Sequence, residues 1–192
     1  MKLRGFYIIL IALLFSGIVN AQDTQQNSYA EDFELGIIGG IGFSNVVGAD
    51  VGGNGLRLGI HLGAFAEIEI DSEFGFRPEV HIISVKGTSS GGFRSLYFDF
   101  PLMGTYDIDD QISLLAGFQP SFLLHARTQN EGAITQLIRT IDFGVVVGGW
   151  YKLDDVWSLG ARFSHSILRV GADGNERTFN ANFQLSVGYQ IF

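Results

Sequence analysis

The sequence predicts an all-β fold, an eight-stranded antiparallel up-and-down transmembrane β-barrel. Three observations support this prediction. Apolar and polar residues alternate along eight long segments, the connections between these segments alternate between long and short, and aromatic residues gather at the segment ends. A period of two is typical of a strand with one apolar face and one polar face.

The last segment, residues 178–192, shows the alternation most clearly. Its apolar members run from Phe179 to Ile191 and alternate with asparagine, glutamine, serine and glycine. The segment is longer than the usual strand of about five or six residues, and aromatic residues stand near both ends of its apolar face. A strand of this kind spans a bilayer in a closed barrel, so the other segments are expected to be its neighbours.

The N-terminus has the pattern of a secretory signal peptide. Lys2 and Arg4 precede an apolar run at residues 6–15, and a small-residue site ends at Ala21, which predicts cleavage after Ala21. No apolar run reaches the roughly 20 residues that a spanning helix needs. The expected organisation is a signal peptide at residues 1–21, a periplasmic lead-in at residues 22–32 and an outer-membrane β-barrel at residues 33–192.

Each predicted strand is justified by the apolar residues on its outward face. The eight strands are expected at about residues 33–43, 57–70, 74–86, 94–106, 111–125, 140–152, 156–168 and 178–192. Pro78 inside the third strand indicates a bulge or a locally weak ladder. In chain order, the outward residues include Phe33, Leu35, Ile37; Leu58, Ile60, Leu62; Phe76, Val80, Ile82; Leu96, Phe98, Leu102; Ile112, Leu114, Phe118, Phe122; Ile141, Phe143, Val145; Trp157, Leu159, Phe163; and Phe183, Leu185, Val187.

The connections sort into two classes. Residues 71–73, 107–110 and 154–155 form short acidic turns, whereas the connections at residues 44–56, 87–93, 126–139 and 169–177 are longer. Outer-membrane barrels have short periplasmic turns and longer extracellular loops, so this order predicts a periplasmic N-terminus. Two aromatic girdles are expected, one at the periplasmic strand ends and one near the opposite rim: Phe33, Phe74, Tyr106, Tyr151, Trp157 and Tyr189, and Phe43, Phe143 and Phe179.

Composition separates the membrane barrel from a soluble exported barrel of the lipocalin type, which also has eight alternating strands. Mean hydropathy is +0.24 and only 17% of residues are charged, whereas a soluble surface has about 25–35% charged residues. Loss of Lys2 and Arg4 would move the net charge from −8 to −10, which argues against nucleic acid as a partner. Cysteine is absent, so no disulfide framework is expected.

The polar face contains a set of charged residues that would lie in the barrel lumen. If residues 71–73 form a three-residue loop, Glu67 lies directly opposite Arg77 and can form a cross-strand ion pair. The set could form an ion or proton path, but a charge network that fills the lumen is favoured, because eight strands leave room only for side chains. The predicted lumen charge network comprises Glu67, Glu69, Arg77, Glu79, Asp99, Asp142 and Arg162.

Several blocks together resemble the PorT-like outer-membrane β-barrel family of Bacteroidetes. They are GIIGGIGFSN, HLGAFAEIEIDSEFGFRPEVHIISVKG, LYFDFPLMGTYDI, LLAGFQPSFLL, DFGVVVGGWYKL, LGARFSHSI and FQLSVGYQIF. The resemblance covers nearly the whole predicted mature chain. It implies an eight-stranded outer-membrane barrel and, for some members, a role in protein secretion and gliding machinery. The ending departs from the common Gly-Tyr-X-Phe, because Ile191 is interposed and Phe192 falls off the outward parity. Either a local bulge or weaker recognition by the assembly machinery would follow from this ending.

A lipid-modifying enzyme is the catalytic alternative. His165 lies between Ser164 and Ser166, an arrangement that resembles the serine and histidine of the lipid A deacylases. Adjacent residues on a strand point to opposite faces, so neither serine can reach His165 without a bulge, and an enzyme is not expected. The four histidines fall on separate strands without a carboxylate-rich cluster, so no metal site or cofactor is expected.

The sequence therefore predicts an integral outer-membrane protein with a structural or interaction role, in contact with outer-membrane lipids. The extracellular loops are the expected surface for protein partners, especially residues 48–54 and 126–139, because loops on a rigid barrel carry recognition. Secretion or envelope assembly machinery is the expected context. A small-solute channel and a lipid-modifying enzyme remain the alternatives.

Overall fold

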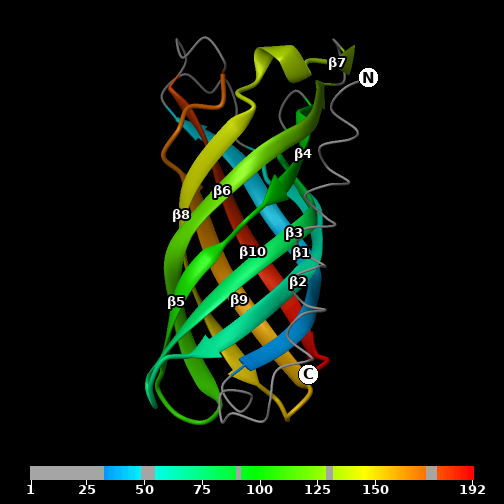
Figure 1. Cartoon of the computed structure of the whole chain (residues 1–192). Coiled ribbons are helices and arrows are strands. Elements are labelled where there is room, and N and C mark those ends of the chain that lie inside the picture. Colours follow the sequence, from blue (N-terminus) through cyan, green and yellow to red (C-terminus); the bar gives the residue numbers. More distant parts are fainter. Residues whose placement is uncertain (1–32, 49–54, 90–91, 129–131, 172–176) are drawn as a thin grey trace, which may run out of the picture. The chain divides into compact units, whose positions relative to one another are not determined.

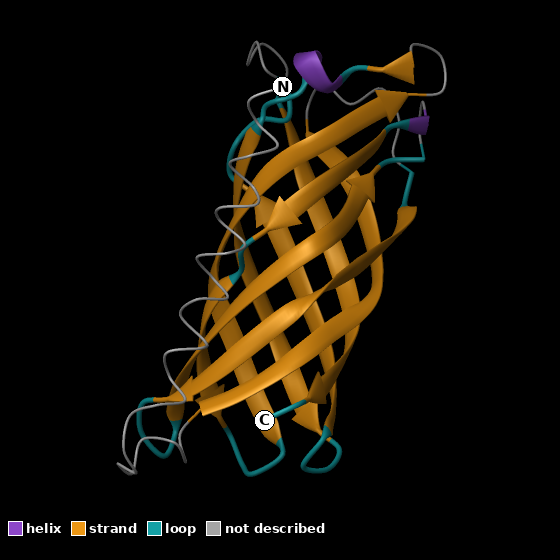
Figure 2. Cartoon of the chain, turned by 45° about the vertical axis from the view of Figure 1, so that its right-hand side comes forward, coloured by secondary structure: helices purple, strands orange, loops and turns teal. Residues whose placement is uncertain are grey.

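The first and last strands lie side by side and close the sheet into a barrel (Figures 1 and 2). In the computed structural model, β1 (Phe33–Gly48) pairs antiparallel with β10 (Thr178–Gln190), from Gly36 opposite Gln190 to Gly48 opposite Thr178. The structure describes residues 33–48, 55–89, 92–128, 132–171 and 177–192. The predicted signal peptide and lead-in, and much of the loop at residues 48–54, lie outside these ranges.

The barrel has eight spanning strands, which confirms the predicted fold class. Each strand pairs with its sequence neighbours, so the connectivity is up-and-down. The short β7 (Gly132–Ala133) pairs with the end of β6, and the 3₁₀ turn η3 (Thr135–Leu137) follows it. No helix among the described residues is long and apolar enough to cross a membrane. The remaining strands are β2 (Arg57–Glu69), β3 (Phe74–Gly87), β4 (Arg94–Asp99), β5 (Leu102–Asp107), β6 (Ile112–Thr128), β8 (Ile141–Lys152) and β9 (Trp157–Ser166).

The predicted fourth strand is divided into β4 and β5. Phe100 and Pro101 separate them, and a proline has no N–H to donate to a ladder. Both halves pair with β3 and β6, so together they occupy one strand position. Backbone hydrogen bonds hold the residues between β4 and β5 to both adjacent strands. Glu79 N on β3 donates to Pro101 O, and Phe100 N donates to Pro120 O on β6, each at 2.8 Å.

A β-bulge in β3 changes which residues face the lumen. Leu62 pairs with Ile83, whereas Gly63 pairs with His81, so Ile82 is the extra residue. The bulge lies beyond Pro78, which itself pairs regularly with Leu102. Unbroken alternation would direct Lys86 outward, but the added residue reverses the parity. Lys86 is therefore buried inside the barrel.

The three short turns share one local hydrogen-bond pattern. Asp71, Asp109 and Asp154 each use Oδ1 to accept hydrogen bonds from the backbone N–H groups two and three residues later, at 2.7–2.9 Å. Such Asx turns reverse the chain without a glycine. In the exposed turn after β8, the two backbone donors lower the pKa of Asp154 below its usual 3.8. We call this end of the barrel the turn end and the opposite end the loop end.

The outer face of the barrel is apolar and the inner face is polar. Large side chains such as Leu58, Ile60, Phe118, Val147 and Leu185 are exposed, while serine, asparagine, glutamine and charged residues fill the interior. A soluble barrel has the opposite arrangement, so the pattern is that of a transmembrane barrel. The predicted turn-end girdle is also exposed on the outer face, and the rings of Phe74 and Tyr106, and of Trp157 and Tyr189, are in contact.

Two apolar clusters occupy part of the interior. The loop-end cluster closes the interior beneath the loops, with Ile138 packed against it. The Trp150 cluster lies beside the charged residues described below. The loop-end cluster comprises Val46, Phe93, Tyr97, Leu123, Ala126, Ile134 and Val170, and the Trp150 cluster comprises Ile38, Phe65, Met103, Leu115, Val146 and Trp150.

Gly160 is required because the indole ring of Trp150 occupies the space beside it. A Cβ at Gly160 would overlap with ring atoms of Trp150, whereas a Cβ at Gly104 would have its nearest neighbour, Ala116 O, at 3.8 Å. We expect Gly160→Ala to destabilise the barrel by about 1–3 kcal/mol, the usual effect of overpacking. Gly104→Ala is the matched control and should leave the urea midpoint in lipid vesicles unchanged or raised. Equal midpoints for the two variants would contradict this prediction.

Candidate functional site: the lumen charge network

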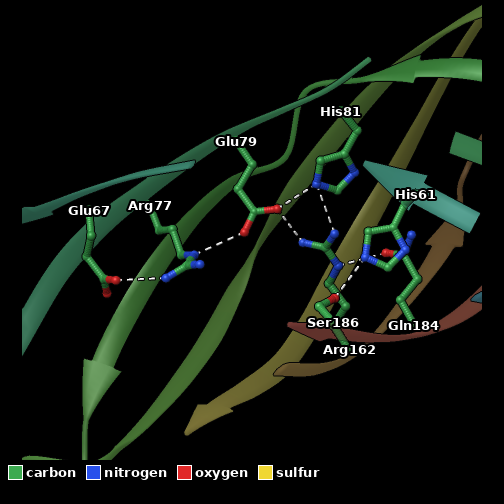
Figure 3. Close-up of polar contacts among 8 residues, drawn as sticks. All are labelled: His61, Glu67, Arg77, Glu79, His81, Arg162, Gln184 and Ser186. Atoms are coloured by element: carbon green, nitrogen blue, oxygen red, sulfur yellow. Dashed lines mark hydrogen bonds and ion pairs between the residues drawn. The ribbon is translucent and has the colours of Figure 1, made fainter. Parts of the chain in front are cut away.

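A chain of ion pairs crosses the lumen from β2 through β3 to β9 (Figure 3). Arg77 Nη1 donates to Glu67 Oε2 at 2.8 Å, and Arg77 Nε donates to Glu79 Oε1 at 3.0 Å. Arg162 Nη1 reaches the other oxygen of Glu79 at 2.6 Å. The predicted ion pair between Glu67 and Arg77 is confirmed. The two residues face each other because the three-residue turn places Ile70 opposite Phe74 and so sets the register of β2 and β3.

Glu79 is the centre of the network. Its side chain is fully buried between two guanidinium groups, and His81 Nε2 lies 2.8 Å from Glu79 Oε2. The same His81 nitrogen lies 3.1 Å from Arg162 Nη2. It donates to Glu79 when protonated and accepts from Arg162 when not, so the two contacts alternate with the tautomer. Arg162 Nε also donates to Gln184 Oε1 at 2.7 Å.

Aromatic rings hold Arg77 in place. Its guanidinium carbon lies 3.9 Å from the ring centroid of Phe65 and 4.1 Å from that of Trp150. Both contacts are within the range of cation–π interactions, which are stronger in a desolvated site. The two rings also explain why Arg77 Nη2 has no hydrogen-bond partner. Phe65 and Trp150 lie on the polar parity of their strands, which indicates that both rings face the lumen but not that they contact Arg77.

A second polar group lies nearer the loop end. Lys86 Nζ donates to Asp99 Oδ1 at 3.0 Å and to Ser121 Oγ at 3.3 Å, and lies 4.8 Å from the ring centroid of Tyr97. Asp142 Oδ2 separately accepts from Ser166 Oγ at 2.5 Å and Asn180 Nδ2 at 2.9 Å. Asp99 and Asp142 therefore lie in the lumen but outside the chain of ion pairs around Glu79.

Glu69 does not belong to the network. It is exposed at the end of β2, opposite Gly75, and forms no ion pair among the described residues. The prediction was wrong at this position because alternation specifies the face of a strand but not where the barrel interior ends. His61 was not included in the predicted network, yet it is buried in the lumen, with Nε2 2.9 Å from Ser186 Oγ.

Two small cavities lie in the described part of the lumen. A cavity beside Glu67 and Arg77 has a volume of about 10 Å³, and a second beside Lys86 and Asp142 also measures about 10 Å³. Each has room for about one water molecule. The ion pairs, the loop-end cluster and the Trp150 cluster thus occlude the described interior, and the arrangement stabilises the barrel without a wide aqueous path.

The histidine considered for catalysis lies on the outer face. His165 stacks near Phe163 and Phe179, at 6.4 and 6.0 Å between ring centroids. Ser164 and Ser166 point into the lumen, where both are buried. The serines thus face away from His165, as strand alternation requires. Among the described residues, no group of three or more His, Cys, Asp or Glu side chains could hold a metal ion.

The fold and its polar, occluded interior define an integral β-barrel protein of the outer membrane. The chain belongs to the family described as the outer membrane protein beta-barrel domain, whose model matches residues 9–190. Because such barrels have periplasmic turns, the turn end faces the periplasm and the loop end faces the outside.

Solved structures of two other outer-membrane proteins are among those similar in fold. Ail, the attachment invasion locus protein of Yersinia pestis, is 14% identical with a TM-score of 0.56, covering 83% of this chain and 99% of Ail. Neisserial surface protein A (NspA) is 13% identical with a TM-score of 0.56, covering 82% of this chain and 97% of NspA. No curated protein sequence matches this chain. At these identities the similarity extends to the fold alone.

Proposed function

We propose that this barrel is a non-enzymatic interaction component of the envelope, which binds a protein partner of secretion or assembly machinery through its extracellular end. The observation that carries the proposal is the occluded lumen. Buried ion pairs and two apolar clusters fill much of the described lumen, and its two described cavities hold about one water each. A protein partner would then bind at the rims of the barrel. The sequence resemblance to the PorT-like family supports secretion as the context.

The described part of the loop between β6 and β8 is suited to contact a partner. Ile134 is buried in the loop-end cluster, its N donates to Ala126 O at 2.9 Å, and Arg139 N donates to Val170 O at 2.9 Å. These contacts fix the segment on the barrel rim, where Figure 1 shows it above β6 and β8. Leu137 is 58% exposed on it. A partner that binds this loop would bury Leu137, because loops held on a rigid barrel carry recognition.

In-cell crosslinking tests this proposal. Leu137→Cys at the loop end and Asp109→Cys at the turn end would each be coupled to a photocrosslinker in the full chain, and captured proteins identified by mass spectrometry. We expect one reproducible partner from Leu137→Cys and a different or empty pattern from Asp109→Cys. Leu137→Ser should reduce co-purification of that partner by about tenfold, which corresponds to about 1.4 kcal/mol and is the scale of losing one buried leucine side chain.

Three results would contradict the proposal. Stable single-channel conductance of the purified protein in planar bilayers would show that the lumen opens and would favour the small-solute channel. A change in lipid composition that depends on the barrel and disappears in His165→Ala would favour the lipid-modifying enzyme. Capture of lipid alone at Leu137 would also exclude the proposed partner.

A further inference from the structure

Charge is divided between the two ends of the barrel. Of the ten lysines and arginines in the described ranges, six are arginines at the loop end: Arg57, Arg94, Arg127, Arg139, Arg169 and Arg177. The described carboxylates outside the lumen all lie at the turn end: Glu34, Glu69, Asp71, Glu73, Asp107, Asp109, Asp110, Asp154 and Asp155. The described residues of the extracellular rim therefore carry positive charge, while four further acidic residues of the same loops, Asp50, Glu131, Asp173 and Glu176, lie outside the described ranges.

Three of these arginines form a cluster. Arg94 on β4 and Arg127 on β6 are direct cross-strand partners, and their strand neighbours Ser95 and Ala126 are buried inside, so Arg94 and Arg127 follow the outward parity. Arg57 on β2 lies opposite the buried Ser44 and therefore follows the inward parity, but it is near enough for electrostatic repulsion from both. Its Nη1 donates to the Phe93 carbonyl at 3.3 Å. We call Arg57, Arg94 and Arg127 the arginine cluster.

The arginine cluster is not neutralised by the described part of the protein. None of its members forms an ion pair with a described carboxylate, whereas Arg77 and Arg162 in the lumen both pair with Glu79. Like charges placed directly opposite on a sheet are destabilising. An external anion between Arg94 and Arg127 would convert this repulsion into attraction.

An aromatic patch lies beside the arginine cluster on the same strands. Phe98 and Phe122 are cross-strand partners on the outward parity of β4 and β6. The ring of Phe100 lies 4.6 Å from that of Phe98 and 6.2 Å from that of Phe122, in both cases edge to face. The outer surface thus changes from guanidinium groups at the rim to aromatic rings toward the centre, which matches a lipid with an anionic head and apolar chains.

We propose that the outward-facing Arg94 and Arg127 of the arginine cluster bind the phosphate groups of a lipid A-type glycolipid in the outer leaflet, with its acyl chains on the patch of Phe98, Phe100 and Phe122. Arginine forms bidentate, charge-assisted hydrogen bonds with phosphate. The cluster lies at the extracellular end of strands that span the bilayer, which is where the phosphates of outer-leaflet lipid are located. This lipid site is independent of the protein partner proposed at Leu137.

Native mass spectrometry of the refolded full chain in detergent micelles tests the lipid site. The probe is bis-phosphorylated lipid A, compared with dephosphorylated lipid A and phosphatidylglycerol. We expect one tightly bound phosphorylated lipid A, and a loss of affinity of about tenfold or more in the double variant Arg94→Gln/Arg127→Gln. The matched control, Arg139→Gln/Arg169→Gln, removes the same charge from the β8–β9 side of the rim and should retain binding.

The outcomes separate a specific site from general charge attraction. Equal weakening by both double variants, or equal binding of phosphatidylglycerol or dephosphorylated lipid A, would overturn the proposal. Complete displacement by millimolar inorganic phosphate would also overturn it, because the site would then select free phosphate. Arg94→Lys/Arg127→Lys keeps the charge and should bind with intermediate affinity. The electrophoretic shift between heated and unheated samples verifies that each variant is folded.

Discussion

Glu79→Gln is expected to destabilise the barrel by about 3–5 kcal/mol, the usual cost of removing one partner from a buried ion pair. Glu79 is the shared acceptor of Arg77 and Arg162, and all three side chains are nearly or fully inaccessible to water. Glutamine keeps the shape but removes the negative charge, which leaves two guanidinium groups buried with insufficient compensation. Urea unfolding in lipid vesicles, followed by tryptophan fluorescence, measures the change.

A double-mutant cycle distinguishes the charge effect from a packing defect. In Glu79→Gln/Arg162→Met, one of the uncompensated cations is gone, so the double variant should be more stable than the sum of the two single changes predicts. Coupling of about 0.5–3 kcal/mol is expected for residues in contact. A loss below about 1 kcal/mol in Glu79→Gln, or strict additivity in the cycle, would mean that the network contributes little to stability.

The sequence predicted the features that depend on strand alternation alone. The eight strand positions, the apolar outer face and the turn-end aromatic girdle follow from a period of two and from the order of short and long connections. The contact between Glu67 and Arg77 was also predictable, because a short turn fixes the register of the two strands that it joins. Their ion pair at 2.8 Å is the result.

Features that depend on departures from alternation were predictable only in part. Lys86 is buried because Ile82 is an extra residue in β3, and no local sequence signal marks the position of that bulge. Pro101 itself was a sequence signal for the division of the fourth strand. The residues on both sides of it nevertheless pair with β3, so the two halves still occupy one strand position. The stacking of Arg77 between Phe65 and Trp150 joins β2, β3 and β8, and only the closed barrel brings those strands together.

Lys86→Met should destabilise the barrel by about 3–5 kcal/mol, although the same change at Lys152 should have little effect. Both lysines form an ion pair with a carboxylate at about the same distance, Lys86 with Asp99 at 3.0 Å and Lys152 with Glu34 at 3.3 Å. The side chains of the first pair are 4% and 0% exposed, and those of the second are 35% and 30% exposed. Burial, rather than distance, therefore separates the two predictions.

The physical reason is that each lysine substitution leaves its partner carboxylate without a cation. Lys86→Met leaves the Asp99 carboxylate buried, where its Oδ2 already lacks a hydrogen-bond partner, whereas Lys152→Met leaves Glu34 in contact with water. An exposed pair contributes about 0–1 kcal/mol. Urea midpoints of the two variants in the same vesicles make the comparison, and Lys86→Met/Asp99→Leu should recover much of the loss, because it removes both charges. Similar midpoints for Lys86→Met and Lys152→Met would show that water reaches Asp99 and that the lumen is more open than its cavities indicate.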